Sequence, residues 1–173
     1  AIVGLHGTRV EKLEALAAEL GERVHILPAN MSNMDEVKAL GQKAEADMEG
    51  VDILVNNAGI FNMASIDKIT PEDYRRQYDI NVGGTIFACQ AVVPAMKKQG
   101  GGAILNMASV ASSVGIADRF DLLAVIPLAA EKILSGGLAG KGQELGAAHF
   151  NRCPQTNPRT LPELRERELM IHS

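Results

Sequence analysis

The sequence predicts an α/β fold: a doubly wound parallel sheet in three layers, with helices on both faces. Short apolar runs of strand character alternate with amphipathic stretches of helical spacing along most of the chain. The runs are apolar almost throughout, which is typical of parallel strands that are buried on both faces. Such units assemble naturally into a right-handed doubly wound sheet. The four predicted strands are residues 1–5, 24–27, 51–55 and 103–107, and we expect a sheet of four or five strands.

Two amphipathic helices are predicted between the first three strands. The first spans residues 9–20 and stops at Gly21. Its apolar residues recur at helical spacing, at Val10, Leu13, Leu16 and Leu20. The second begins at Ser32, which together with Asp35 three residues later resembles a capping box.

A third helix start is encoded by Thr70-Pro71-Glu72-Asp73, which combines an N-cap hydroxyl, a proline at N1 and acids in the first turn. A long apolar helix is expected over residues 83–98. The pattern weakens after about residue 120. There we expect an apolar stretch of poor periodicity at 121–138, a short helix at 143–150, a loop at 153–162 and an exposed charged helix at 161–171.

These patterns predict one domain over residues 1–150, of which 121–150 are degenerate, followed by a C-terminal tail over 151–173. The first residue is Ala in a strand-like run rather than Met, so we expect the sequence to be a piece of something longer.

Composition and charge exclude several function classes. The net charge is −4 and no basic block offers a surface that could follow a phosphate backbone, so we expect no nucleic-acid partner. No apolar run approaches the roughly 20 residues that span a bilayer, so we expect no membrane segment. Cys89 and Cys153 fit neither a disulfide framework nor a metal cluster, and they indicate a reducing cytoplasm and no metal site.

Ligands of open α/β sheets bind beyond the carboxyl ends of the strands, and three motifs stand there or close by. They are Asn56-Asn57-Ala58-Gly59, Asp79-Ile80-Asn81-Val82 and Ile104-Leu105-Asn106-Met107-Ala108-Ser109-Val110. In this order and at this spacing they resemble the short-chain dehydrogenase/reductase family, most closely bacterial 3-oxoacyl-[acyl-carrier-protein] reductase. The resemblance covers residues 1 to about 120 and starts at the family's second strand. It implies a Rossmann-like fold whose first strand is missing.

The resemblance implies a dinucleotide site at this edge. Asn57, Ala58 and Gly59 would lie beside the adenosine half, where glycine lets the backbone approach the cofactor closely. The stretch that flanks adenine is occupied by Asn30 and Met31. Thr8 and Arg9 follow the strand whose end sets cofactor choice. With no acid between Leu5 and Val10, we expect NADP rather than NAD, while a solvated Arg9 in the first turn of a helix remains the alternative.

Two residues correspond to catalytic positions of the family. Ser109 would hydrogen-bond the substrate oxygen where negative charge develops, and Asn81 would hold a proton-relay water. The alternative for Ser109 is a hydroxyl at a strand end that is satisfied by backbone.

Two family features are absent from the sequence. The family's acid is a tyrosine with a lysine four residues on, but Leu122 and Ile126 stand at the corresponding positions. The only tyrosines are Tyr74 and Tyr78. The first strand and its glycine-rich phosphate turn are also missing from the N-terminus.

The glycine-rich segment 135–142 leaves three possibilities open. It can be a displaced nucleotide loop or an unrelated linker; alternatively, residues 143–149 and 152–154 correspond to a later helix and strand of the family.

We therefore expect an NAD(P)(H)-dependent oxidoreductase that acts on the carbonyl/alcohol pair of a small molecule, with very weak or no turnover in this chain. The alternative is a non-catalytic fragment or degenerate paralogue that retains only its fold and self-association. The helix at 83–98 would be the interface of a homo-oligomer in either case, as the resemblance implies.

Overall fold

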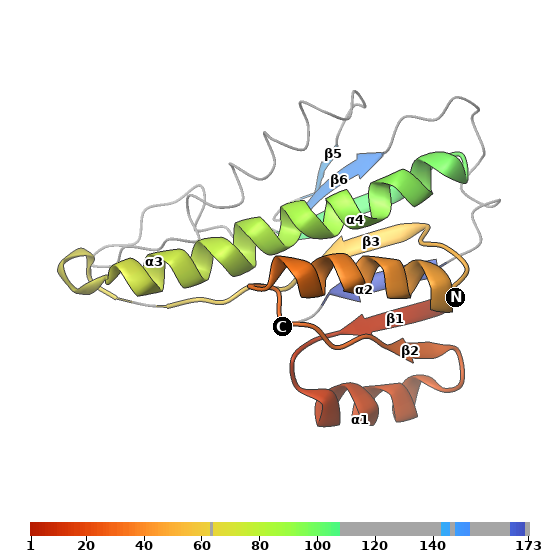
Figure 1. Ribbon diagram of the computed structural model, residues 1–173, viewed down its shortest axis with the longest axis horizontal. Helices are drawn as coiled ribbons and strands as arrows, with labels where there is room; N and C mark the ends of the chain where they lie inside the picture. Colours follow the sequence, from red (N-terminus) through yellow and green to blue (C-terminus); the bar gives the residue numbers. More distant parts are fainter. Residues whose placement is uncertain (63, 108–142, 146–147, 153–166, 172–173) are drawn as a thin grey trace.

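The fold is organised around one seven-stranded sheet (Figure 1). The computed structural model describes residues 1–62, 64–107, 143–145, 148–152 and 167–171. The strands are β1 (Ile2–His6), β2 (Val24–Ile26), β3 (Ile53–Asn56), β4 (Ala103–Met107), β5 (Gln143–Leu145), β6 (Ala148–Arg152) and β7 (Arg167–Ile171). Their order across the sheet is β2-β1-β7-β3-β4-β6-β5.

The first five strands in this order are mutually parallel, whereas β6 and β5 run antiparallel to their neighbours. The predicted α/β architecture with a parallel sheet is therefore confirmed. The sheet has more strands than the expected four or five, because β5, β6 and β7 come from the part of the chain whose pattern is weak.

Two predicted helices of the C-terminal part are wrong. The stretch 143–150 forms β5 and most of β6, and the last five residues of 161–171 form β7. The backbone of β6 pairs with β4, and that of β7 pairs with β1 and β3, all of which are distant in sequence. Such pairing overrides local propensity because the ladder satisfies the peptide groups of the segment. The predicted features at 121–138, 135–142 and 153–162 lie outside the described residues.

Among the described residues, four α-helices accompany the strands, together with one 3₁₀ turn and one π segment. They are α1 (Val10–Leu20), α2 (Met34–Asp47), η1 (Ile66–Lys68, 3₁₀), α3 (Pro71–Gln77), η2 (Tyr78–Gly84, π) and α4 (Thr85–Lys98). The predicted helix 9–20 is confirmed, and it ends at Gly21 with a positive φ of 90°. Glycine adopts this conformation without the strain that a Cβ would introduce.

The predicted start of the second helix at Ser32 is wrong by one residue. Asn33 is the N-cap, and its side-chain oxygen accepts from the backbone N–H groups of Asp35 and Glu36 at 3.1 and 3.4 Å. The Ser32 hydroxyl instead donates to the Asn30 side chain. Ser and Asn are both good caps, and adjacent cap residues are not distinguished by sequence pattern alone.

The predicted start at Thr70 is confirmed as a full capping box with Asp73. The helical backbone then continues from α3 through η2 into α4. The first two residues of the predicted helix 83–98 therefore belong to the π segment η2, and the rest form α4. A π segment inside a helix is energetically unfavourable and is often found at functional sites.

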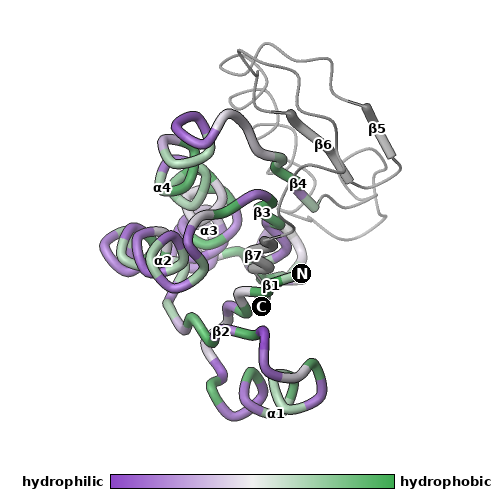
Figure 2. Tube along the Cα trace, turned by 90° about the vertical axis from the view of Figure 1, so that its right-hand side faces the viewer, coloured by the Kyte–Doolittle hydropathy of each residue, from purple (hydrophilic) through white to green (hydrophobic). Residues whose placement is uncertain are grey.

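The main core lies between the sheet and the pair α2 and α4 (Figure 2). In this view α2, α3 and α4 gather on one side of the strands, while α1 lies apart from them at the β2 end of the sheet. Gly41 of α2 permits the two long helices to approach closely, since a Cβ there would lie 2.4 Å from the Ala91 Cβ.

Candidate functional site

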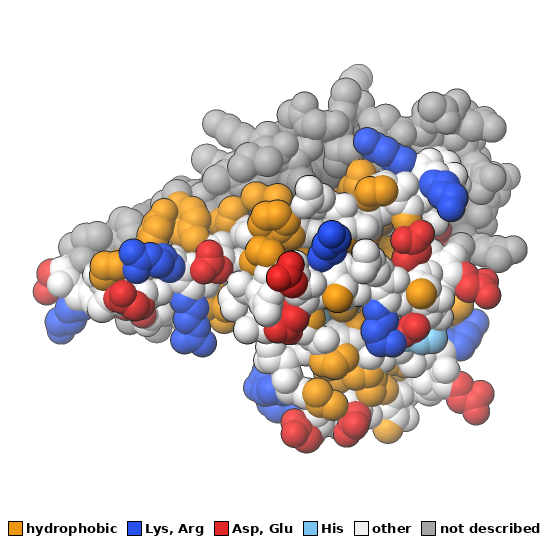
Figure 3. Space-filling view, in the orientation of Figure 1, with side chains coloured by type: hydrophobic (Ala, Val, Ile, Leu, Met, Phe, Trp, Pro, Cys, Tyr) orange, Lys and Arg blue, Asp and Glu red, His pale blue; other side chains and the backbone are white. Residues whose placement is uncertain are grey.

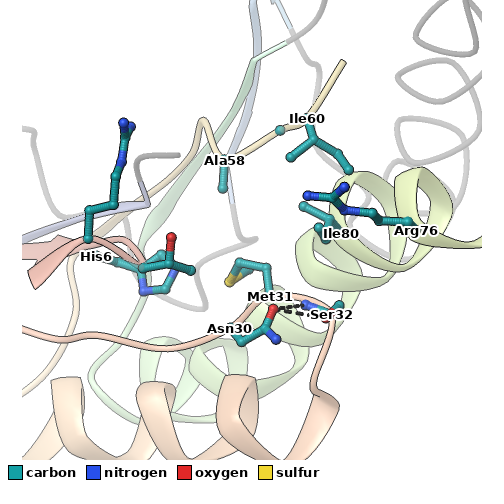
Figure 4. A pocket seen from close by; sticks show the side chains of 11 residues that line it. His6, Asn30, Met31, Ser32, Ala58, Ile60, Arg76 and Ile80 are labelled. Carbon is teal, nitrogen blue, oxygen red and sulfur yellow. Dashed lines mark hydrogen bonds between the residues drawn. The ribbon is translucent and has the colours of Figure 1, made fainter. Parts of the chain in front are cut away.

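A cavity of about 780 Å³ opens beyond the carboxyl ends of β1 and β3 (Figure 4). Six residues that the sequence assigned to cofactor binding line it: Thr8, Arg9, Asn30, Met31, Ala58 and Gly59. Five further residues complete the wall: His6, Ser32, Ile60, Arg76 and Ile80. The position of the cavity agrees with the rule that ligands of open α/β sheets bind at the carboxyl edge.

The remaining predicted residues stand in other places. Asn57 precedes the lining residue Ala58 and is half-buried without lining the cavity itself. Asn81 lies behind the wall, and Ser109 lies outside the described residues. The predicted cofactor residues are thus brought together almost completely, and the predicted catalytic serine is not located.

The loop after β2 is folded by its own polar side chains. The Asn30 side-chain oxygen accepts from the backbone N–H of Ser32 at 3.0 Å and from its hydroxyl at 2.8 Å. The Asn30 backbone N–H in turn donates to the Glu36 carboxylate at 2.8 Å. Met31 is held between these turns with only 5% of its surface exposed, so it presents an apolar wall to the cavity.

The opposite wall is fixed by Asn81. Its side-chain oxygen accepts from the Ile60 N–H at 2.8 Å, and its amide nitrogen donates to the Ile60 carbonyl at 2.9 Å. Asn81 is 7% exposed, and its backbone carbonyl accepts from the Thr85 hydroxyl at 2.9 Å. In this structure the asparagine therefore clamps the segment after β3 to the helix.

The chain itself places no strong demand for glycine at position 59. A Cβ there would meet the Asn81 side-chain oxygen at 3.5 Å, an ordinary contact, and Gly59 is not among the positive-φ residues. The close approach of a cofactor, which the family resemblance implies, would be a reason for glycine at this position.

His6 forms the floor of the cavity and is 1% exposed. Its Nδ1–H donates to the Leu27 carbonyl at 2.9 Å, which ties the end of β1 to the end of β2. Burial lowers the pKa of the imidazole below its usual 6.5, although the hydrogen bond to Leu27 opposes the shift. The ring is therefore neutral at pH 7, and its Nε2 is an acceptor.

The charged groups of the described wall are both cationic. Arg9, the N-cap residue of α1, is one of them. The other is Arg76 of α3, which lies beside Ile60 and Ile80 (Figure 4). No Asp or Glu is among the described lining residues. Guanidinium groups suit the geometry of phosphate, so both side chains are of a kind that can bind an anionic ligand.

Sequence reasoning missed His6 and Arg76 for different reasons. His6 is a polar residue that ends an apolar run two positions before the assigned Thr8, so its position in the sequence could have identified it. Arg76 has no local signal, because only the packing of α3 beside the loop after β3 brings it to the cavity.

Beneath the cavity, Asn56 connects β3 to β4 and to α4. Its amide nitrogen donates to the Asn106 side-chain oxygen at 2.8 Å and contacts the Cys89 sulfur at 3.3 Å. Burial raises the pKa of Cys89 to about 11, with the Asn56 hydrogen bond opposing the shift. Cys89 is therefore an unreactive core thiol at neutral pH.

Within the part of the chain that the structure describes, no group of three or more His, Cys, Asp or Glu side chains is placed to bind a metal ion. None of the helices described combines the length and apolarity that crossing a bilayer requires.

Comparison with known proteins identifies the family. Nodulation protein G of Rhizobium sp. (strain N33) is 53% identical over 115 residues, which are 66% of this chain and 47% of that protein. Galactitol 2-dehydrogenase of Agrobacterium fabrum (strain C58 / ATCC 33970) is 39% identical over 100 residues, 57% of this chain and 39% of that protein. The chain thus spans less than half the length of these curated relatives.

A solved structure shares the fold. The gluconate 5-dehydrogenase from Burkholderia cenocepacia J2315, in complex with NADP and tartrate, superposes with a TM-score of 0.69 at 28% identity. The match covers 79% of this chain and 54% of that one. The family model of the short chain dehydrogenases matches residues 1–120, the same stretch that carries the three motifs and most of the cavity wall. The chain therefore belongs to the short chain dehydrogenase family.

Proposed function

We propose that this chain binds NADP in the cavity beyond β1 and β3, as a member of an oxidoreductase family that acts on carbonyl/alcohol pairs of small molecules. The observation that carries the proposal is that six of the residues predicted to bind the cofactor, Arg9 among them, line one cavity, and that Arg76 lines it as well. A carboxylate at this strand end would suit the ribose 2′-hydroxyl of NAD, whereas arginine accommodates the 2′-phosphate of NADP.

The other lining residues fit the adenosine half of the cofactor. Met31 supplies an apolar wall for the adenine ring, and the neutral His6 adds no charge that would favour a different ligand. The Asn81 clamp holds Ala58 and Gly59 where backbone can approach the ribose. The Asn30 oxygen is already engaged by Ser32, so its amide nitrogen is the group left for the adenine edge.

When bound, the nicotinamide of the cofactor supplies or accepts the hydride. In this proposal Ser109 hydrogen-bonds the substrate oxygen, and Asn81 supports a proton-relay water. The sequence contains no Tyr-x-x-x-Lys to donate the proton, so turnover by this chain is very weak or absent. We place the substrate among 3-oxoacyl compounds or similar carbonyl/alcohol pairs, and the protein in the cytoplasm.

The test is a fluorescence titration with NADPH and NADH on the wild-type chain and on R9Q and R76Q. A charge-assisted hydrogen bond contributes about 1.5–3 kcal/mol, so each variant should weaken NADPH binding by about tenfold or more. NADH binding should change much less, because it lacks the 2′-phosphate. R75Q is the matched control for R76Q, since Arg75 lies on α3 next to Arg76 but pairs with Glu72 and does not line the cavity.

Saturable NADPH binding that is weakened by R9Q and R76Q, and not by R75Q, supports the proposal. Absence of saturable binding to the wild-type chain would refute it. Consumption of NADPH with a 3-oxoacyl substrate, compared between wild type and S109A, then measures whether any turnover remains.

The second candidate is a non-catalytic member that retains self-association through residues 83–98. One observation favours it: Phe87 of α4 is 38% exposed, and hydrophobic side chains gather on the face formed by α3 and α4 (Figure 3). The NADPH titration distinguishes the two candidates, because the non-catalytic candidate does not require the chain to bind a cofactor.

A further inference from the structure

The most unusual feature of the sheet is the position of β7. This strand lies between β1 and β3, hydrogen-bonded in parallel to both, although 110 residues separate it from β3 in the sequence (Asn56 to Arg167). The two strands on either side of it do not pair with each other among the described residues. We call the space between their facing backbone edges the strand slot, bounded by Ile2–His6 and Ile53–Asn56.

The register matches the apolar residues of β7 to the most buried part of the strand slot. Leu169 stands opposite Gly4 and Leu54, and Met170 stands opposite Leu5 and Val55. Gly4, Leu5 and Leu54 are all buried. Arg167 and Glu168 instead pair at the amino end, farthest from the cavity. Central parallel strands are typically apolar, and residues 169–171 of β7 are apolar in sequence.

The last pair of the register connects the strand slot to the cavity. Ile171 stands between His6 and Asn56, the final residues of β1 and β3. The wall residues Thr8 and Arg9 follow one of these strands, and Ala58 to Ile60 follow the other. The strand that separates β1 from β3 therefore also sets the distance between the two walls, about two strand spacings or roughly 10 Å.

We propose that the strand slot is a binding site for an extended apolar segment, that residues 167–171 of the same chain occupy it, and that this docking positions the two walls of the cavity. Without an occupant, β1 and β3 would each carry an edge of unpaired N–H and C=O groups in the middle of the sheet. The walls would then lose the ladder that connects them.

Hydrogen exchange on the wild-type chain tests the docking directly. The amides of residues 169–171 should exchange at least about a hundredfold more slowly than those of an unstructured peptide, as do the amides of β1 and β3. This protection should be unchanged over a hundredfold range of chain concentration. Free exchange at 169–171 would overturn the proposal, and protection that disappears on dilution would assign the occupant to a second copy instead.

A pair of variants tests the positioning. M170P removes a ladder N–H from a strand with two neighbours, whereas M170I keeps it and is well suited to a strand. M170P should lower the protection of residues 2–6 and 53–56 and weaken NADPH binding by about tenfold or more, while M170I stays within about twofold of wild type. Equal protection of these strands in M170P and M170I would overturn the positioning role.

The measurement of NADPH binding rests on the proposed function, whereas the measurement of hydrogen exchange does not. Slow exchange at 169–171 without any NADPH binding would refute the cofactor proposal and leave the docking intact. If NADPH binds while the amides of residues 169–171 exchange freely, the docking proposal is refuted and the cofactor proposal stands.

Discussion

His6 has an uncharged ring because burial removes the water that would solvate an imidazolium. Its one donor is directed to the Leu27 carbonyl, so a single side chain ties two strand ends and forms the cavity floor. The lowered pKa follows from this burial. Protonation would place a charge at a site that the fold has closed to solvent.

The lowered pKa of His6 makes stability depend on pH in a defined direction. In the unfolded chain the histidine takes up a proton as pH falls through about 6.5, whereas the folded chain does not until lower pH. The unfolded state then binds more protons, so the free energy of unfolding should fall as pH falls below 6.5. Urea unfolding between pH 7.5 and 5 measures this loss.

The variant H6N should reduce the loss, because asparagine offers a donor near Leu27 but does not titrate in this range. H25N on the neighbouring strand β2 is the matched control and should retain the wild-type pH dependence. Parallel stability curves for wild type and H6N would show that His6 is not responsible.

At the scale of elements, the crossing of α2 and α4 determines where the helical layer lies. Val37, Leu40 and Ala44 of α2 are buried in the same cluster as Val92 and Met96 of α4. Where the helices come closest, position 41 has no Cβ. The helix α4, which continues directly from the η2 segment that contains Asn81, is thus packed against α2 in the core cluster.

Gly41→Ala should destabilise the chain even though alanine is the better helix former. The new Cβ would lie 2.4 Å from the Ala91 Cβ, which is attached directly to backbone and cannot rotate away. Forcing extra volume into a packed contact costs about 1–3 kcal/mol, which exceeds the gain of up to about 1 kcal/mol in helix propensity. Urea unfolding followed by circular dichroism measures the net effect.

The double variant G41A/A91G is the control, since it moves the methyl group from one helix to the other. It should be more stable than G41A alone, with a coupling between the two sites of about 1 kcal/mol or more. Additive effects of the two substitutions would contradict a steric origin.

At the scale of the whole molecule, the described residues offer a candidate surface for self-association. Hydrophobic side chains gather over α3 and α4 in Figure 3. Tyr74 of α3 and Phe87 of α4 expose 47% and 38% of their surface. Aromatic side chains contribute strongly to protein interfaces because they bury a large area at low entropic cost. This is the surface that the proposed self-association through residues 83–98 would use.

F87K should therefore raise the dissociation constant of self-association by about tenfold or more, as seen in sedimentation equilibrium. F61K is the matched control, because Phe61 is 49% exposed but lies in the loop after β3 rather than on α4. Equal masses for wild type and F87K across the concentration series would argue against an interface at α4.

Much of the site was predictable from the sequence, because it depends on a local rule. Residues that follow parallel strands meet at one edge of the sheet, so Thr8, Arg9, Asn30, Met31, Ala58 and Gly59 were identified without coordinates. The strand and helix pattern of the first 107 residues is local in the same sense. Apolar periodicity and capping residues such as Thr70 determine it.

The sequence by itself therefore determined the α/β order, the parallel sheet and the edge at which a cofactor would bind. Only the tertiary structure decided that Arg76 reaches the cavity, that Asn81 clamps Ile60 and that residues 167–171 form a central strand. The physical reason is the range of the interactions. Helix caps and apolar periods act between near neighbours, whereas a central strand is stabilised by backbone groups 110 or more residues away, and no local pattern encodes them.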